Sequence, residues 1–145
     1  MMSCTLCPRN CNVNRANNER GFCGAPANPV VAAAMPHMWE EPCISGTHGS
    51  GTIFFSGCNL ACTYCQNHEI SRHIRGRSVF SNELRQIFVE LTEQGVHNIN
   101  LVTPTCYADK ISEALTSRLS VPVLSRGNNY PEDCTATPVN KGFTV

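Results

Sequence analysis

The order of hydrophobic patterns predicts an α/β fold, a piece of a parallel sheet or barrel, in the middle of this 145-residue chain. Three strand patterns alternate with two helix patterns. Each crossover is long enough to hold a helix, so the strands should pair in parallel through right-handed βαβ units. The length suits one domain with a real core. We expect a cysteine-rich extension over residues 1–49, a partial β/α domain over 50–124 and an irregular tail over 125–145.

The first strand and helix follow from a short apolar run and a helical repeat. Residues 52–56 (TIFFS) form a β-branched and aromatic run between Gly51 and Gly57, which predicts a strand. Ser81 is the expected N-cap of a helix that ends at Gly95. Its inner face should carry the apolar residues at helical spacing, namely Leu84, Ile87, Phe88 and Leu91.

The next stretch of the chain repeats the order of strand and helix. Residues 98–103 (NINLVT) predict a strand that Pro104 stops, and residues 108–119 predict a helix. Residues 121–124 predict a third strand. The segment 125–145 has neither period, so we expect coil there.

Charge and hydropathy exclude some function classes. The 11 basic residues balance 11 acidic ones, which argues against a nucleic-acid partner. The longest apolar stretch, residues 30–35, is too short to span a bilayer, and no secretory signal precedes it. Ten cysteines without a signal indicate a reducing, cytoplasmic setting in which thiolates hold metal.

The strongest motif is the CxxxCxxC triplet Cys58, Cys62 and Cys65 in GCNLACTYCQN. Structural zinc needs four closed ligands, whereas three thiolates suit a 4Fe-4S cluster with one open iron. The triplet follows a predicted parallel strand, at the edge where α/β folds place active sites. The alternative is a disulfide or a zinc site that takes a further cysteine from elsewhere in the chain.

A second group of thiols lies near the N-terminus. Cys4, Cys7, Cys11 and Cys23 predict a second metal site, and the spacing leaves zinc, an auxiliary iron-sulfur cluster and unliganded thiols open. The other three cysteines, Cys43, Cys106 and Cys134, are expected to be structural or incidental.

These motifs resemble the radical S-adenosylmethionine (radical SAM) superfamily, because an aromatic residue, Tyr64, precedes the last cysteine of the triplet. The blocks WEEPCISGTHGSGTIFFSGCNLACTYCQNHEIS, HNINLVTPT, CTLCPRNCNVNR and GFCG are similar to the branch of pyruvate formate-lyase activating enzyme-like proteins. The resemblance covers about residues 4–124 and implies a partial, TIM-like parallel β/α barrel. Such a barrel needs more βα units than these, so we expect a truncated one.

The resemblance also implies roles for particular residues. Cys58, Cys62 and Cys65 would ligate three irons of a 4Fe-4S cluster, and the fourth iron would bind S-adenosylmethionine. Tyr64 would pack beside the adenine. Thr103 begins the segment that would contact S-adenosylmethionine, and Cys106 stands there where the branch pattern VTPTHY has histidine.

The implied function is reductive cleavage of S-adenosylmethionine to a 5′-deoxyadenosyl radical, followed by hydrogen-atom abstraction. The chain would act with an electron donor of the flavodoxin or ferredoxin type, and a protein substrate such as a glycyl radical enzyme fits an activase. No residue is expected to be catalytic in its own right, because the cofactors carry the chemistry. The alternative is a non-catalytic metal-binding module, with iron-sulfur or zinc, and neither alternative calls for a membrane.

Overall fold

The computed structural model describes residues 3–116, 119 and 123–126. Its centre is a five-stranded mixed sheet in the order β3-β1-β2-β4-β5. The strands are β1 (Val30–His37), β2 (Ser50–Phe55), β3 (Arg77–Ser78), β4 (Ile99–Val102) and β5 (Val123–Arg126). The neighbours β2, β4 and β5 are parallel, whereas β1 pairs antiparallel with both β2 and β3. The expected α/β fold with parallel pairing is confirmed, and the described sheet stays open.

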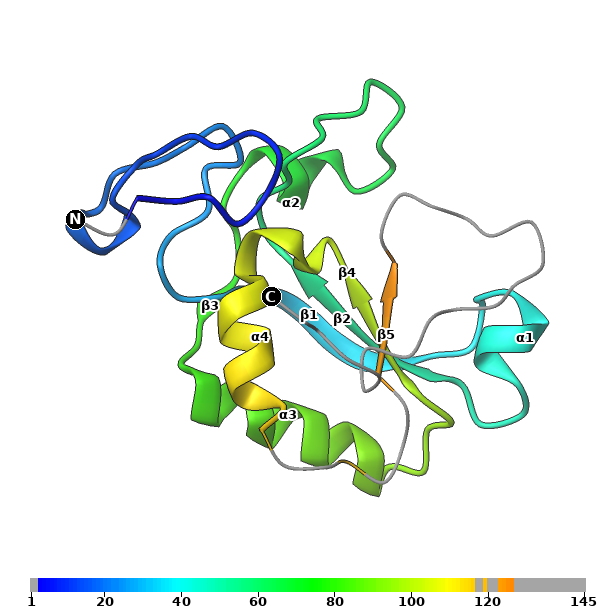
Figure 1. The fold of residues 1–145 in the computed structure, drawn as a ribbon. Helices are drawn as coiled ribbons and strands as arrows, with labels where there is room; N and C mark the ends of the chain where they lie inside the picture. Colours follow the sequence, from blue (N-terminus) through cyan, green and yellow to red (C-terminus); the bar gives the residue numbers. More distant parts are fainter. Residues whose placement is uncertain (1–2, 117–118, 120–122, 127–145) are drawn as a thin grey trace.

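Helices connect the parallel strands on one face of the sheet (Figure 1). The longest is α3 (Ser81–Glu93), and α4 (Ala108–Ala114) follows a 3₁₀ turn, η2 (Pro104–Tyr107). Two short helices, α1 (Pro42–Ser45) and α2 (His68–Arg72), lie in the connections between strands. A second 3₁₀ turn, η1 (Arg15–Asn17), lies in the N-terminal coil before β1. The N-terminal coil and the loop before α2 gather where the arrowheads of β2 and β4 point (Figure 1). The carboxyl edge of the parallel strands therefore carries both cysteine-rich segments.

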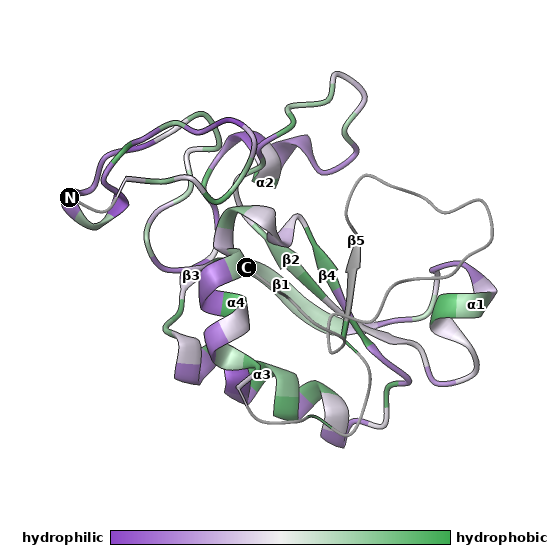
Figure 2. Cartoon of the chain, in the orientation of Figure 1, coloured by the Kyte–Doolittle hydropathy of each residue, from purple (hydrophilic) through white to green (hydrophobic). Residues whose placement is uncertain are grey.

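The core lies between this sheet and α3. Strand register places Ile53 of β2 beside Leu101 of β4, so both side chains point to the same face. The apolar stripe of α3 covers that face with Leu84, Phe88 and Leu91, all of them buried. Figure 2 shows hydrophobic residues along β2 and β4 and alternating hydrophobic and hydrophilic residues around α3. The helical spacing of apolar residues thus predicted the correct inner face.

One strand was not expected from the sequence. Residues 1–49 were expected to form a cysteine-rich extension, yet β1 spans Val30–His37 within them and pairs with β2 from Val31 to His37. The sheet therefore begins inside the expected extension. The strand contains three alanines and a proline, which are poor strand formers, and a register shift between Val31 and Ala33 interrupts its alternation.

Several element boundaries also differ from expectation. The N-cap of α3 is Phe80 and not Ser81, because the Glu83 carboxylate accepts a hydrogen bond from the Phe80 backbone N–H at 2.8 Å. Helix α4 ends at Ala114, five residues before the expected end at 119. Strand β5 includes Ser125 and Arg126, which were assigned to the tail. The predictions for residues 121–122 and 127–145 lie outside the described residues.

No helix in the described part of the chain has the length and hydropathy needed to cross a membrane.

Candidate functional site

The loop after β2 begins with a glycine that the surrounding chain requires. Gly57 has φ +87°, and a Cβ at this position would lie 2.9 Å from the Cys23 carbonyl oxygen. The Gly57 N–H donates to the Ile70 carbonyl of α2 at 2.8 Å. The N-terminal segment and α2 therefore both meet the chain one residue before Cys58.

The predicted cluster cysteines lie on this loop with reduced side chains. Cys58 and Cys65 are half-buried, and Cys62 is exposed. The Ser71 hydroxyl of α2 contacts the Cys65 sulfur at 3.6 Å. The Arg72 guanidinium donates to the Ala61 carbonyl at 2.9 Å. Helix α2 therefore contacts the loop at two residues, Ala61 and Cys65.

The donor set of this loop fits an iron-sulfur cluster in kind and number. Three thiols within residues 58–65 are the soft ligands such a cluster requires, and they leave one iron open. Within the described residues, no three or more His, Cys, Asp or Glu side chains already stand together as a metal site. The loop would therefore have to close around a bound cluster.

The other two predicted cofactor-binding residues occupy different surroundings. Tyr64 is 98% exposed on the loop, with its ring in solvent. Thr103 follows β4 with φ +57°, and its hydroxyl donates to the Phe55 carbonyl at 2.9 Å. Thr103 thus joins the ends of β4 and β2 at the edge where the cysteine loop begins.

Tyr107 of η2 supports the base of the same loop. Its hydroxyl donates to the Ser56 carbonyl at 2.8 Å, and its ring packs against Phe55 with 5.8 Å between centroids. The side chain is fully buried, and burial is the main reason that the pKa of Tyr107 is raised. This residue therefore serves as a neutral hydrogen-bond donor under the loop.

The N-terminal thiols lie beside this loop and not away from it. Cys4, Cys7, Cys11 and Cys23 line one cavity of about 20 Å³. The segment folds back on itself because the Cys4 N–H donates to the Val13 carbonyl at 2.9 Å. Asn10 and Asn12 take the left-handed conformations that the reversal needs.

A fifth thiol, Cys106 of η2, lines the same cavity. The Cys106 S–H donates to the Cys23 sulfur, which is the main reason that the pKa of Cys23 falls to about 6. The pKa of Cys106 is raised by the same hydrogen bond and by burial. The sequence predicted that Cys106 is structural or incidental, and the residue is buried in the core. Its place in the VTPTHY-like segment was a signal that it lies at the sheet edge.

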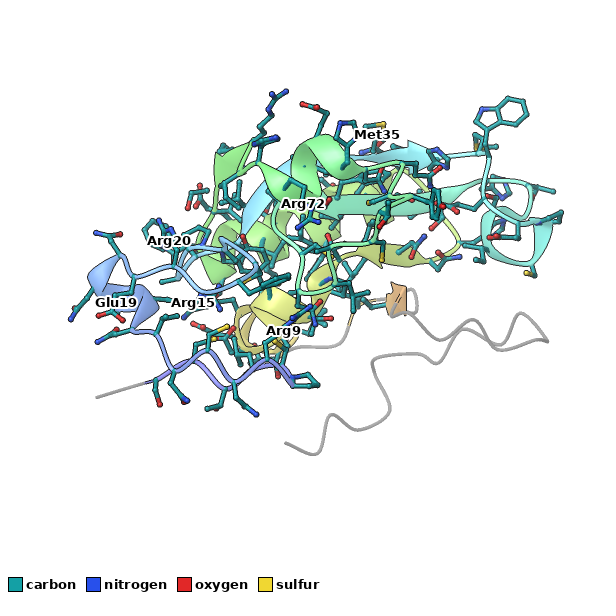
Figure 3. The ribbon with its side chains drawn as sticks, turned by 90° about the horizontal axis from the view of Figure 1, so that it is seen from above. Arg9, Arg15, Glu19, Arg20, Met35 and Arg72 are labelled. Atoms are coloured by element: carbon teal, nitrogen blue, oxygen red, sulfur yellow. The ribbon has the colours of Figure 1, made fainter. Side chains whose placement is uncertain are left out.

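Two arginines fasten the N-terminal segment to this edge. The Arg9 Nε donates to the Asn59 carbonyl of the cysteine loop at 2.9 Å. Arg15 donates to the Cys106 carbonyl at 2.7 Å and to the Pro26 carbonyl at 3.0 Å. Figure 3 shows Arg9 beside the body of the molecule and Glu19 at the outer end of the segment.

The sheet face opposite α3 carries polar side chains that sequence reasoning did not single out. Asn100 of β4 is 1% exposed, and its Nδ2 donates to Glu40 Oε1 at 3.4 Å. His37 Nδ1 lies 3.7 Å from the same oxygen. Asn100 Oδ1 and His37 Nδ1 are buried without a hydrogen-bond partner. This face can therefore accept further polar contacts.

Comparison with known proteins gives one family and two relatives. The family model of the Radical SAM superfamily matches residues 52–132. An uncharacterized protein of Methanocaldococcus jannaschii is 40% identical over 70 residues, which is 48% of this chain and 19% of that protein. The 7-carboxy-7-deazaguanine synthase of Methanothermobacter thermautotrophicus is 30% identical over 83 residues, 56% of this chain and 34% of that enzyme. No solved structure matches the chain. The chain therefore spans about a third or less of the curated relatives it matches.

Proposed function

The chain belongs to the radical SAM superfamily, and from this premise we propose that it binds a 4Fe-4S cluster through Cys58, Cys62 and Cys65 and cleaves S-adenosylmethionine reductively. The observation that carries the proposal is the position of the three thiols. They follow β2 directly, at the carboxyl edge of the parallel strands and inside the matched residues 52–132. Active sites of α/β folds lie at this edge.

The residues of the chain would bind and orient the cofactors. The three thiolates hold the irons, and the Ser71 hydroxyl beside Cys65 is placed to donate to a ligating sulfur. Tyr64 is exposed, so its ring is accessible to an adenine ring, and Thr103 stands at the adjoining strand end. When bound, the cluster would supply the electron for reductive cleavage of S-adenosylmethionine to methionine and a 5′-deoxyadenosyl radical, the species that would abstract a hydrogen atom.

We also propose a branch within the superfamily, an electron donor and a protein substrate. The sequence blocks around the cysteines favour the branch of pyruvate formate-lyase activating enzyme-like proteins. A low-potential cluster needs an electron donor of the flavodoxin or ferredoxin type and the reducing conditions of the cytoplasm. A glycyl radical enzyme is the protein substrate that an activase of this branch would take.

Anaerobic reconstitution tests the proposal. The full chain is loaded with iron and sulfide, reduced with dithionite and incubated with S-adenosylmethionine, and 5′-deoxyadenosine is measured by chromatography. We expect a visible iron-sulfur spectrum and 5′-deoxyadenosine from the parent chain. Cys62→Ala should lose both, whereas Cys43→Ala should keep both because Cys43 is an exposed residue of α1.

Two outcomes separate the alternatives. A cluster that forms without any 5′-deoxyadenosine would favour the non-catalytic iron-sulfur module. Full iron and sulfide content in the Cys62→Ala chain would show that the triplet does not hold the cluster.

A further inference from the structure

Positive charge is concentrated in the two segments that gather at the carboxyl edge of the sheet (Figure 1). Residues 3–24, the N-terminal segment, and residues 57–75, the cysteine loop with α2, contain five arginines and two glutamates, a net charge of +3. The rest of the chain contains six basic and nine acidic residues, a net charge of −3. This separation gives the carboxyl edge a positive field in a chain that is neutral as a whole.

Two of these arginines contact the cysteine loop directly. Arg9 donates to the Asn59 carbonyl and Arg72 to the Ala61 carbonyl, each at 2.9 Å. Both arginines are exposed and are labelled in Figure 3, and no carboxylate among the described residues forms an ion pair with either of them. A guanidinium has five N–H groups, so one hydrogen bond to the loop leaves most of its donors for a partner.

Apolar side chains accompany the two charges. The guanidinium carbon of Arg9 lies 3.7 Å from the centre of the Phe22 ring, and Phe22 is 49% exposed. Leu60, which is 37% exposed, lies between the two loop residues whose carbonyls accept these hydrogen bonds. Cys62, the most exposed of the three predicted cluster ligands, follows them in the loop. Apolar residues with arginines at their border are typical of a protein interface, and here they adjoin the proposed redox centre.

We propose that Arg9, Phe22, Leu60 and Arg72, the donor face, dock an acidic one-electron carrier protein of the flavodoxin class. The inference rests on the proposed 4Fe-4S cluster and adds where its electron donor binds. In each encounter the reduced carrier loses one electron and the cluster gains it, and no covalent bond forms or breaks. The positive field would speed the encounter, and a small interface of this kind suits rapid release of the spent carrier.

Nucleic acid is the other partner that a basic surface would attract. The donor face favours a protein for two reasons. The chain has no net positive charge, and one face of the Phe22 ring already stacks on Arg9, where a base would otherwise lie.

Turnover with a protein donor tests the donor face. The full chain is loaded with cluster, and 5′-deoxyadenosine formation is measured once with an acidic flavodoxin kept reduced by its reductase and once with excess dithionite. The ratio of the two rates is compared between chains, so a variant that holds less cluster does not alter it. Arg9→Gln with Arg72→Gln should lower the ratio at least about fivefold at low salt, and the loss should shrink in about 0.5 M NaCl.

Two matched pairs of substitutions separate charge from loop structure. Arg9→Lys with Arg72→Lys keeps both charges and should hold the ratio within about twofold of the parent. Arg77→Gln with Lys110→Gln removes the same charge from β3 and α4, where both cations are already paired with carboxylates, and should also stay within about twofold. A loss that the lysine pair shares with the glutamine pair would show that the arginines only shape the loop, and the proposal would be wrong.

Carbodiimide cross-linking to flavodoxin gives a reading that needs neither cluster nor turnover. The reagent couples lysine amines to carboxylates in contact with them and leaves arginine unmodified, and the natural chain has only Lys110 and Lys141. In the chain with Arg9→Lys and Arg72→Lys, peptide mass spectrometry should find flavodoxin linked to the introduced lysines and not to Lys110. Links at Lys110 in their place, or an RNA oligonucleotide that blocks the links at physiological salt, would overturn the proposal.

The proposed cluster and the donor face fail separately. Absence of 5′-deoxyadenosine with dithionite would reject the proposed function, and the cross-links would still decide whether the donor face binds flavodoxin. Turnover with dithionite, together with an unchanged rate ratio in the Arg9→Gln, Arg72→Gln chain, would reject the donor face alone.

Discussion

At the scale of single residues, Tyr107 links the core to the carboxyl edge of the parallel strands, where the Cys58 loop begins. Its buried hydroxyl is the donor for the Ser56 carbonyl, two residues before Cys58. Tyr107→Phe leaves that buried carbonyl without its donor, so the free energy of unfolding should fall by about 1 to 3 kcal/mol. Urea unfolding of the unloaded chain measures the change.

The control for this prediction is the other tyrosine of the site. Tyr64 is 98% exposed, so Tyr64→Phe should change the free energy of unfolding by less than about 0.5 kcal/mol. Equal effects of the two substitutions would show that the Tyr107 hydroxyl contributes nothing to holding the loop.

Local spacing made the Cys58 loop predictable, and distant contacts hid the rest of the site. Cys58, Cys62 and Cys65 lie within one short loop, so their pattern is visible in a single stretch of sequence. The approach of Cys106 to Cys23 depends on how β4 and the N-terminal segment meet in space. The polar contact between Asn100 and Glu40 likewise joins residues that no local pattern relates.

At the scale of elements, α3 was predictable and β1 was not. The apolar residues of α3 recur at helical spacing over 13 residues, and that period alone defines its buried face. Strand β1 owes its existence to pairing with β2 and β3, because its own alanines and proline do not favour a strand. Boundaries such as Phe80 at the start of α3 depend on a single hydrogen bond, which composition does not show.

The edge pair of β1 and β3 depends on one glycine. Gly76 has φ +125°, and a Cβ there would lie 2.7 Å from the Cα of Ala32 and closer still to the Val31 carbonyl oxygen. Gly76→Ala should therefore push β3 away from β1 and lower the free energy of unfolding by about 3 kcal/mol, from backbone strain and lost pairing. Urea unfolding and amide exchange at Val30 and Val31 measure it.

A second glycine separates strain from crowding. Gly95 follows α3 with φ +80° and has no atom within 4 Å of its added Cβ. Gly95→Ala should lower the free energy of unfolding only by the strain of an alanine in a left-handed conformation, about 1 kcal/mol. If Gly76→Ala cost no more than Gly95→Ala, the close approach to Val31 would not matter for stability.

At the scale of the whole molecule, the N-terminal segment packs against the edge of the sheet and is not a separate extension. Its thiols share a cavity with η2, and Arg9 reaches the cysteine loop. The sequence predicted an extension because the segment has no period of its own. The structure shows that hydrogen bonds within the segment, such as Cys4 N–H to the Val13 carbonyl, hold its backbone turns. The side chains of Arg9 and Arg15 then join the segment to the carboxyl edge of the sheet, far along the chain.

Arg15 should control this docking. It donates to the carbonyls of Pro26 and Cys106, and its guanidinium carbon lies 5.4 Å from the centre of the Tyr107 ring. Hydrogen bonds from a charged group contribute more than neutral ones, so Arg15→Ala in the full chain should lower the free energy of unfolding by about 2 kcal/mol. The freed segment should also expose Cys106, which is 4% exposed in the folded chain, to iodoacetamide.

Arg20→Ala, at an exposed position of the same segment, is the matched control and should leave both the free energy of unfolding and the alkylation of Cys106 near the parent values. If Cys106 stayed equally protected after Arg15→Ala, the segment would be held by its thiols and Arg9, and Arg15 would be dispensable for the architecture of this edge.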